Sequence, residues 1–132
     1  MKGFNELIRI AEQARDKAYA PYSGFSVGAA LLCEDGSIYS GCNIESASYT
    51  PTCCAERVAI FKAVSEGKRG FAAVAVSGGK MGEACNEPCY PCGVCRQVLS
   101  EFCSAELAVL LPYEGGVEQT TLGELLPKAF KI

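Results

Sequence analysis

The sequence predicts an α/β protein, a three-layer α/β/α sandwich in which helices cover both faces of a mixed sheet. Segments with helical periodicity alternate with short apolar strands, and glycine-containing turns separate them. The length of 132 residues matches one domain with one core. Because no repeat, low-complexity tract or linker interrupts the sequence, we expect residues 1–132 to form a single domain.

The N-terminal half is predicted to fold as a helix, a hairpin and a second helix. Apolar residues recur at helical spacing across residues 4–18, and Pro21 lies just beyond them, which indicates an amphipathic helix. Two strands, residues 27–33 and 37–42, flank an Asp-Gly turn suited to an antiparallel hairpin. Residues 54–66 are apolar around most of the helix circumference and are followed by glycine, which predicts a buried helix.

The C-terminal half continues this alternation with shorter elements. Residues 72–76 are predicted to form a buried strand, residues 77–91 a loop and residues 107–111 a further strand. A helix between them begins near Gly93 and is expected to bury Val94, Val98, Leu99 and Phe102. A Thr-x-x-Glu sequence near the C-terminus is a capping box that predicts a short last helix.

Charge and cysteine content limit the class of partner and the compartment. The net charge is −3, and no basic run is interleaved with aromatic residues, so we expect a small nucleoside substrate and no nucleic acid partner. The N-terminus does not resemble a signal peptide, and no stretch has the length of a membrane span, which predicts a cytoplasmic protein without membrane contact. Nine cysteines, an odd number, then favour metal ligands and reduced thiols over a disulfide scaffold.

Three thiols and one carboxylate carry the chemical signal of this chain, which contains no histidine. Cys54 lies two residues before Glu56, and Cys92 and Cys95 form a C-x-x-C pair downstream. Three thiolates are one ligand short of a closed structural zinc site, whereas catalytic zinc keeps its fourth position for water or substrate. Glu56 would supply an acid/base group that is not a ligand. The pattern therefore predicts zinc-activated hydrolysis.

Each of these residues also has a simpler interpretation. Glu56 could be a glutamate favoured by the positive end of its helix, and Arg57 a solvated helix residue instead of a charge that compensates the thiolates. Cys89 forms its own C-x-x-C with Cys92, so the residues alone also allow that pair. With Cys89 as a fourth ligand, the site would be a closed Cys₄ site in a non-catalytic zinc-binding module.

A polar pair upstream has the spacing needed to hold a sugar. Asn43 and Glu45 flank Ile44 at strand spacing, so both side chains would point to one face. A donor and an acceptor placed in this way suit the hydroxyl groups of ribose. The simpler interpretation is a turn asparagine beside a solvated glutamate.

The chain resembles the cytidine deaminase family, in particular its short, zinc-dependent, homotetrameric branch. The matching segments span nearly the whole chain and are 20–31 (A-P-Y-S-x-F-x-V-G-A-A-L), 41–45 (G-C-N-I-E), 54–57 (C-A-E-R), 91–97 (P-C-G-V-C-R-Q) and 125–130 (L-L-P-x-A-F). The resemblance implies a mixed central sheet of about five strands. It also implies hydrolysis of cytidine and 2′-deoxycytidine to uridine and 2′-deoxyuridine plus ammonia, in pyrimidine salvage.

The resemblance also decides the expected ligands and the catalytic residue. It implies one Zn²⁺ per chain bound by Cys54, Cys92 and Cys95, with Glu56 as the proton carrier and Arg57 hydrogen-bonded to ligand sulfurs. Among small deaminases of this superfamily, blasticidin S deaminase is the alternative. The retained N-I-E and F-x-V-G-A-A-L segments argue for an ordinary nucleoside.

The expected substrate contacts also follow from the resemblance. Asn43 and Glu45 would bind the 3′-hydroxyl, Phe25 would pack near sugar and base, and the backbone of Ala55 would meet the pyrimidine. Phe130 would reach into a neighbouring subunit's pocket, which predicts a homotetramer with active sites shared between subunits. Relatives often carry a small residue two positions before the Cys92 equivalent, and its carbonyl meets the 4-amino group. Tyr90 departs from this pattern.

Overall fold

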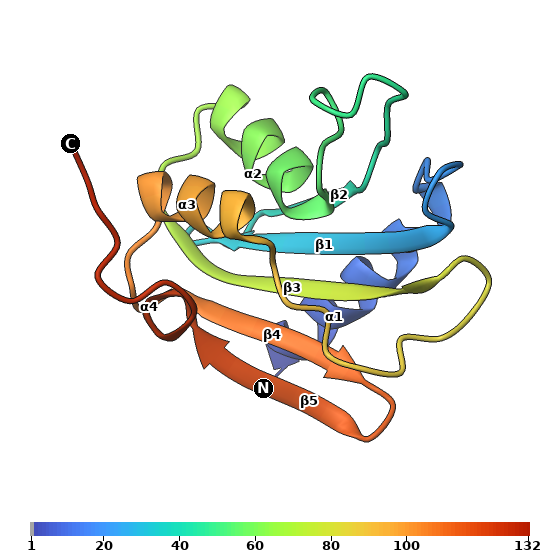
Figure 1. Ribbon diagram of the computed structural model, residues 1–132. Coiled ribbons are helices and arrows are strands. Elements are labelled where there is room, and N and C mark those ends of the chain that lie inside the picture. The colour runs from blue at the N-terminus through green and yellow to red at the C-terminus, as the bar shows by residue number, and fades with distance from the viewer. Residues whose placement is uncertain (1) are drawn as a thin grey trace.

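The computed structural model describes residues 2–132 and forms one five-stranded sheet flanked by helices (Figure 1). The α-helices of this part of the chain are α1 (Lys2–Ala14), α2 (Ala55–Ser65), α3 (Gly93–Phe102) and α4 (Leu122–Leu125), and a 3₁₀ turn, Arg15–Lys17, follows α1. The strands are β1 (Phe25–Cys33), β2 (Ile38–Cys42), β3 (Phe71–Lys80), β4 (Ala108–Tyr113) and β5 (Gly116–Thr121).

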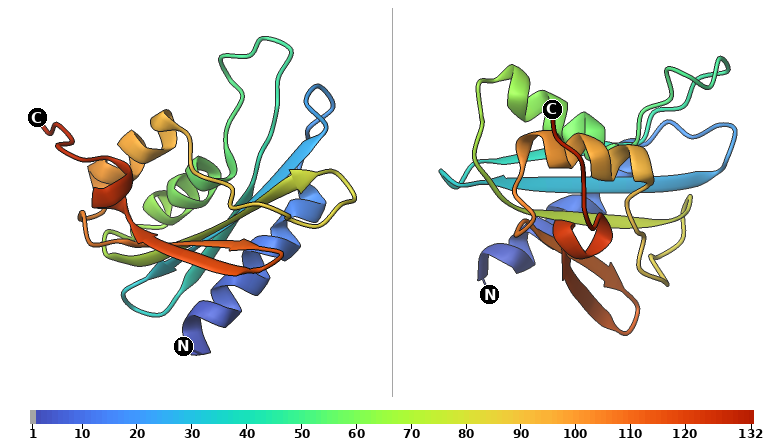
Figure 2. Two further views of the ribbon diagram at one scale, coloured as in Figure 1. Left: turned by 60° about the horizontal axis from the view of Figure 1, so that its bottom comes forward. Right: turned by 60° about the vertical axis from the view of Figure 1, so that its left-hand side comes forward.

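The strands run in the order β2-β1-β3-β4-β5, with one parallel pair, β3 and β4, among antiparallel neighbours. The helix α1 covers one face of this mixed sheet, and α2 and α3 lie side by side on the other (Figures 1 and 2). This arrangement confirms the predicted three-layer α/β/α sandwich. A parallel pair requires a crossover connection, and α3 supplies it between β3 and β4.

Two apolar layers hold the sandwich together, one on each face of the sheet. Residues of α2 and α3 such as Ile60 and Leu99 pack on Leu31, Val74 and Val76. On the opposite face, α1 buries its apolar stripe against a smaller set of sheet residues, which includes Ala30, Ala75 and Leu110. Because strand side chains alternate between faces, neighbouring residues of one strand serve different layers.

Three details of the predicted elements are wrong. The helix α2, expected to be buried, has an exposed face on which Phe61 is 47% exposed. The strand expected at residues 72–76 extends to Lys80, because the Ser-Gly-Gly-Lys segment, whose composition is typical of a turn, pairs with the start of β1. Val94 is 56% exposed and not buried. Cys95 and Leu99 face the sheet instead, and at about 100° per residue this rotation turns Val94 outward.

The remaining elements match their predictions within a few residues. The capping box forms, because the Thr121 side chain accepts a hydrogen bond from the Glu124 amide at the start of α4. The fifth strand, β5, was implied by the resemblance and not by a pattern of its own. Within residues 2–132, the helices are too short or too polar to cross a membrane.

Candidate active site

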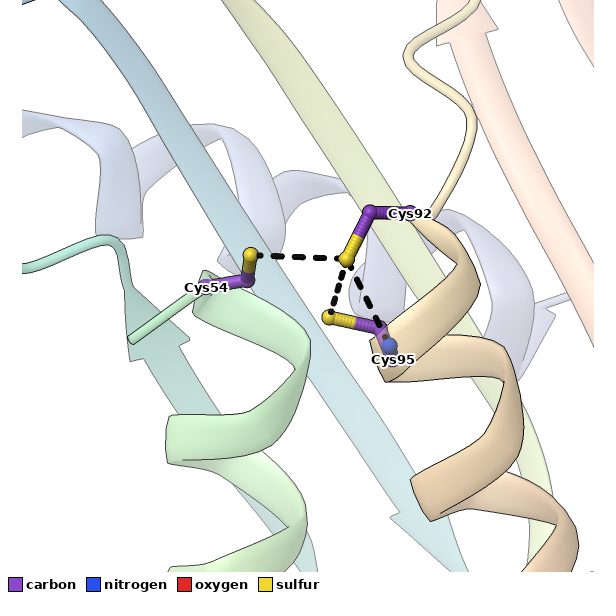
Figure 3. Close-up of side chains that lie close together, drawn as sticks. All are labelled: Cys54, Cys92 and Cys95. Atoms are coloured by element: carbon purple, nitrogen blue, oxygen red, sulfur yellow. Dashed lines mark hydrogen bonds between the residues drawn. The ribbon is translucent and has the colours of Figure 1, made fainter. Parts of the chain in front are cut away.

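The three predicted ligand thiols meet where α2 and α3 begin (Figure 3). The Sγ atoms of Cys54 and Cys92 are 3.7 Å apart, and those of Cys92 and Cys95 are 3.4 Å apart. All three sulfurs lie within 4.8 Å of one another. Cys54 and Cys92, separated by 38 positions in the sequence, therefore belong to one cluster, which sequence spacing alone did not establish.

The helix starts bring the thiols together through their N-terminal geometry. Cys54 is the N-cap of α2, and Cys92 is the N-cap of α3. The Cys92 thiol accepts a hydrogen bond of 3.4 Å from the Cys95 amide. The start of α3 therefore directs an amide at the Cys92 sulfur, whereas the Cys54 side chain accepts no capping hydrogen bond from α2.

A glycine in β2 allows α2 to lie at this position. A Cβ atom on Gly41 would stand 2.5 Å from the Ala55 carbonyl oxygen and 2.7 Å from the Ala59 amide. Since real Cβ atoms essentially never approach so closely, any other residue would move α2 away from the sheet. The G-C-N-I-E segment thus helps to place Cys54 from the neighbouring strand.

The cluster fits a zinc ion. Zinc–sulfur bonds of about 2.3 Å in a tetrahedron place the sulfurs about 3.8 Å apart, close to the separations found here. Cys92 is exposed while Cys95 is fully buried, so the cluster opens on one side. A three-thiolate site with an open side suits a fourth ligand from solvent or substrate.

Arg57 contributes positive charge to the cluster. Its Nη2 atom donates to Cys54 Sγ at 3.3 Å and to the Thr52 carbonyl at 3.5 Å. The Arg57 Nε atom is buried and has no hydrogen-bond partner among the described residues. Hydrogen bonding to the Cys54 thiolate raises the pKa of Arg57. This contact excludes the interpretation of Arg57 as a solvated helix residue.

In the absence of metal, one thiol of the cluster ionises far more easily than another. Hydrogen bonds from the Cys95 thiol and from Arg57 lower the pKa of Cys54 to about 5, against the effect of burial. The hydrogen bond to Cys54, together with burial, raises the pKa of Cys95. One thiolate held by an arginine therefore forms before any metal arrives.

Glu56 lies in the first turn of α2, next to the cluster and 4% exposed. Burial raises the pKa of its carboxyl to about 7, while its own backbone amide opposes this shift. A carboxyl that titrates near neutral pH is suited to take up and release protons at that pH. A solvated glutamate at a helix start would keep a low pKa, so this environment favours the acid/base interpretation.

Cys89 does not join the sulfur cluster. Among residues 2–132, only Cys54, Cys92 and Cys95 form a group that could hold a metal ion. Cys89 instead packs against β3, where a Cβ on Gly78 would stand 2.6 Å from its sulfur. Burial raises the pKa of Cys89 to about 12, which keeps this thiol neutral.

Asn43 contacts the start of β1, and Glu45 contacts the turn before it. Asn43 accepts a hydrogen bond from the Val27 amide and donates one to the Phe25 carbonyl, each 2.9 Å long. Glu45 accepts from the amides of Tyr22 and Ser23 and from the Ser23 hydroxyl. Both side chains therefore hold the protein's own backbone, within residues 22–27.

The remaining predicted substrate residues differ in exposure. Phe25 is 39% exposed, whereas Ala55 is fully buried at the start of α2. Phe130 is 67% exposed and belongs to the C-terminal segment, which extends away from α4 (Figure 1). The structure therefore brings Ala55 to the thiol cluster and leaves Phe130 uncovered in one chain.

Two residues have contacts that the sequence did not reveal, although both lie in motifs. Ser23 receives no role from its A-P-Y-S motif, yet its hydroxyl donates to Glu45 and also accepts from the Phe25 amide. Arg96 follows Cys95 and donates to two backbone carbonyls, those of Pro91 and Leu125. Hydrogen bonds of this kind depend on tertiary contacts, which a motif does not show.

Tyr90, the departure from the family pattern, is tied to the sheet. Its hydroxyl donates to Glu118 Oε1 on β5 at 2.6 Å. The large side chain is thereby anchored on β5, and the backbone of residue 90 still leads directly into the turn that carries Cys92.

The fold and the cluster define a class, the zinc-dependent hydrolases with a three-thiol site and an adjacent glutamate. The sequence model described as "Cytidine and deoxycytidylate deaminase zinc-binding region" matches residues 1–111. The chain belongs to this cytidine deaminase family.

Individual relatives agree with this assignment. A cytidine deaminase of Sporosarcina psychrophila is 53% identical over 126 residues, which cover 95% of this chain and 89% of the relative. The crystal structure of a cytidine deaminase from Burkholderia pseudomallei superimposes with a TM-score of 0.86 at 50% identity, covering 96% and 98% of the two chains. A blasticidin-S deaminase of Bacillus cereus is 31% identical over 136 residues, which cover 96% of each chain.

Proposed function

We propose that this protein hydrolyses the 4-amino group of cytidine and 2′-deoxycytidine, releasing ammonia and leaving uridine and 2′-deoxyuridine. The observation that carries the proposal is the open cluster of three thiols beside a buried glutamate. Cytidine deaminases at about half identity over nearly the whole chain support the same reaction. We assign one catalytic domain to residues 1–132 and place the reaction in pyrimidine salvage.

Cys54, Cys92 and Cys95 would hold one Zn²⁺ per chain. A zinc ion there lowers the pKa of bound water, and so supplies a nucleophile at neutral pH. Three thiolates leave the site with a net charge of about −1, which weakens this effect. Arg57 and the two helix starts provide the positive charge that opposes it.

Glu56 moves the protons of the reaction. Its carboxylate takes a proton from the attacking water and delivers it to ring N3, which makes C4 more electrophilic. Water oxygen adds at C4, and a second proton passes through Glu56 to the departing amino group, which leaves as ammonia. Burial raises the pKa of Glu56 in the metal-free chain, and a carboxyl that is not a strong acid suits a group that acts first as base and then as acid.

The substrate would contact residues on both sides of the cluster. The backbone at Ala55 meets the pyrimidine, and Phe25 packs near sugar and base. Asn43 and Glu45 would bind the 3′-hydroxyl with the hydrogen-bonding capacity left by their backbone contacts, because each amide or carboxylate group can make several bonds.

The assembly would be a homotetramer in which Phe130 completes a neighbour's pocket. Support comes from the apolar C-terminal segment, whose Phe130 is 67% exposed in one chain. Near the sugar residues, a hollow of about 340 Å³ is lined by the exposed side chains of Tyr22 and Tyr49. Sedimentation analysis at assay concentration measures the assembly directly, and an active monomer would contradict it.

The reducing cytoplasm is the compartment we propose, since all nine cysteines are unpaired in the structure. No nucleic acid partner is expected at a net charge of −3.

The activity is tested by the loss of cytidine absorbance in the ultraviolet. Purified enzyme is mixed with cytidine, 2′-deoxycytidine, cytosine and blasticidin S in parallel. We expect both nucleosides to react and cytosine to react very poorly. Preferential turnover of blasticidin S would favour the related antibiotic deaminase instead, and no turnover of any compound by zinc-loaded protein would favour a non-catalytic zinc module.

A further inference from the structure

Arg96 connects the zinc-binding turn to the C-terminal segment. Its Nε atom donates to the Pro91 carbonyl at 2.7 Å, and its Nη1 atom donates to the Leu125 carbonyl at 2.8 Å. Pro91 immediately precedes Cys92, and Leu125 is the last residue of α4. One half-buried guanidinium therefore bridges two parts of the chain that are distant in the sequence but adjacent in space (Figure 2).

The segment beyond α4 has few other anchors. Leu126 is half-buried, and residues 127–132 are exposed. Within residues 2–132, the last backbone hydrogen bond of the chain joins the Leu126 amide to the Leu122 carbonyl. The Arg96 contact thus lies where the hydrogen-bonded part of the backbone ends and the exposed segment that carries Phe130 begins.

We propose that Arg96 is a positioning residue that couples metal binding at Cys92 to the placement of the C-terminal segment. The guanidinium is planar and rigid, so its two donors keep a fixed distance between the carbonyls of Pro91 and Leu125. A change in the turn at Cys92 therefore shifts α4 and the residues after it. Because energetic coupling between two sites is reciprocal, a loosened C-terminal segment also weakens metal binding.

A second arginine provides a matched control. Arg69 also donates to two backbone carbonyls, those of Val64 and Lys68, but both lie in its own stretch of chain. Replacing Arg69 removes the same kind of hydrogen bond without touching the zinc turn or α4. Arg69→Gln and Arg96→Gln therefore separate the loss of an arginine from the loss of this particular bridge.

The decisive experiment is amide hydrogen exchange of the full-length protein with zinc and after treatment with a chelator. In the parent and in Arg69→Gln, we expect chelation to accelerate exchange about fivefold or more in residues 122–126, which hold the last hydrogen-bonded amides of the chain, while exchange in β3 stays unchanged. In Arg96→Gln, the same segment should exchange rapidly in both states. An equal response to chelation in parent and Arg96→Gln would overturn the coupling.

Zinc affinity gives the reciprocal measurement. Competition with a chromophoric chelator should show about tenfold weaker zinc binding in Arg96→Gln, as found for groups that orient metal ligands, and parental affinity in Arg69→Gln. Arg96→Lys keeps the charge but cannot span both carbonyls, so its zinc affinity should lie between those of Arg96→Gln and Arg69→Gln. If Arg96→Gln fails to fold, Arg96→Lys carries both measurements, and parental values in that variant would overturn the proposal.

This inference rests on the proposed zinc ligands, and the outcomes distinguish the two. A parent protein that binds no zinc would refute the ligand assignment and the coupling together. If zinc binds normally but chelation does not change amide exchange in the C-terminal segment, only the coupling is refuted.

Discussion

The two sides of the proposed site differ in how much of them a single chain completes. On the thiol side, formed by Cys54, Glu56, Cys92 and Cys95, every group already faces its partner within one chain. On the sugar side, formed by Phe25, Asn43, Glu45 and Phe130, two groups hold the chain's own backbone and Phe130 is exposed. We therefore expect one chain to bind metal by itself, and nucleoside binding to depend on further contacts, which the proposed assembly would supply.

The largest effect should come from breaking the thiol side. Cys54→Ala removes the ligand that is already ionised near neutral pH, so we expect complete loss of zinc and of activity, measured by metal analysis and cytidine turnover. Cys89→Ser is the control and should keep one zinc per chain. Zinc loss from the Cys89 variant with retention in the Cys54 variant would reverse the ligand assignment.

Glu56→Gln separates chemistry from binding on the same side. The amide keeps the shape of the side chain but carries no proton to the substrate, so kcat should fall about 10²–10⁴-fold while zinc content stays normal. Direct measurement of cytidine binding should show that the nucleoside still binds. A near-parental kcat would remove Glu56 from the mechanism.

The buried carboxyl also predicts a pH dependence of stability in the metal-free protein. Folding raises the pKa of Glu56 from 4.5 to about 7, so between these values the folded state binds a proton that the unfolded state has lost. The Glu56 contribution to the free energy of unfolding should therefore decrease as pH rises from about 4.5 to 7, by up to about 3 kcal/mol, while Cys54, whose pKa is lowered, contributes with the opposite sign in parent and variant alike. Denaturant titrations of parent and Glu56→Gln compare this loss, which should be absent from the variant. Parallel pH profiles would show that Glu56 is not held in a desolvated environment.

On the sugar side, the expected effects are smaller because each contact is a single hydrogen bond. A 3′-deoxy substrate leaves polar groups unpaired, which costs about 1–3 kcal/mol, so kcat/KM should fall roughly five- to 150-fold relative to cytidine. Cytidine and 2′-deoxycytidine should react at comparable rates. If 3′-deoxycytidine reacted as well as cytidine, Asn43 and Glu45 would not bind the 3′-hydroxyl and would only hydrogen-bond to the protein backbone.

The smallest effect is expected at Phe130, the residue that a neighbouring chain would contribute to the sugar side. Phe130→Ala removes one aromatic contact with the base, worth about 0.5–1.5 kcal/mol, so KM should rise several-fold with little change in kcat. Mixing this variant with Glu56→Gln under conditions that exchange subunits should restore parental KM in some sites. A KM that stays high in every mixture would confine each site to one chain.

The sequence predicted the thiol side better than the sugar side for a physical reason. Cysteine spacing and the neighbouring glutamate specify local geometry at two helix starts, and the family resemblance joined them. Hydrogen bonds such as those of Asn43 to β1 depend on strand packing that no local pattern encodes. The same cause explains Val94, whose exposure follows from how α3 rotates to bury Cys95.

A substitution at Gly41 should impair the metal site, although Gly41 is not one of the proposed ligands. A methyl group there would collide with the backbone at the start of α2, so the cost of the substitution falls on the position of Cys54. A screen for variants that lose zinc would recover this glycine beside the cysteines, although it has no ligand atom. In protein engineering, β2 and the start of α2 that carries Cys54 therefore have to be redesigned together.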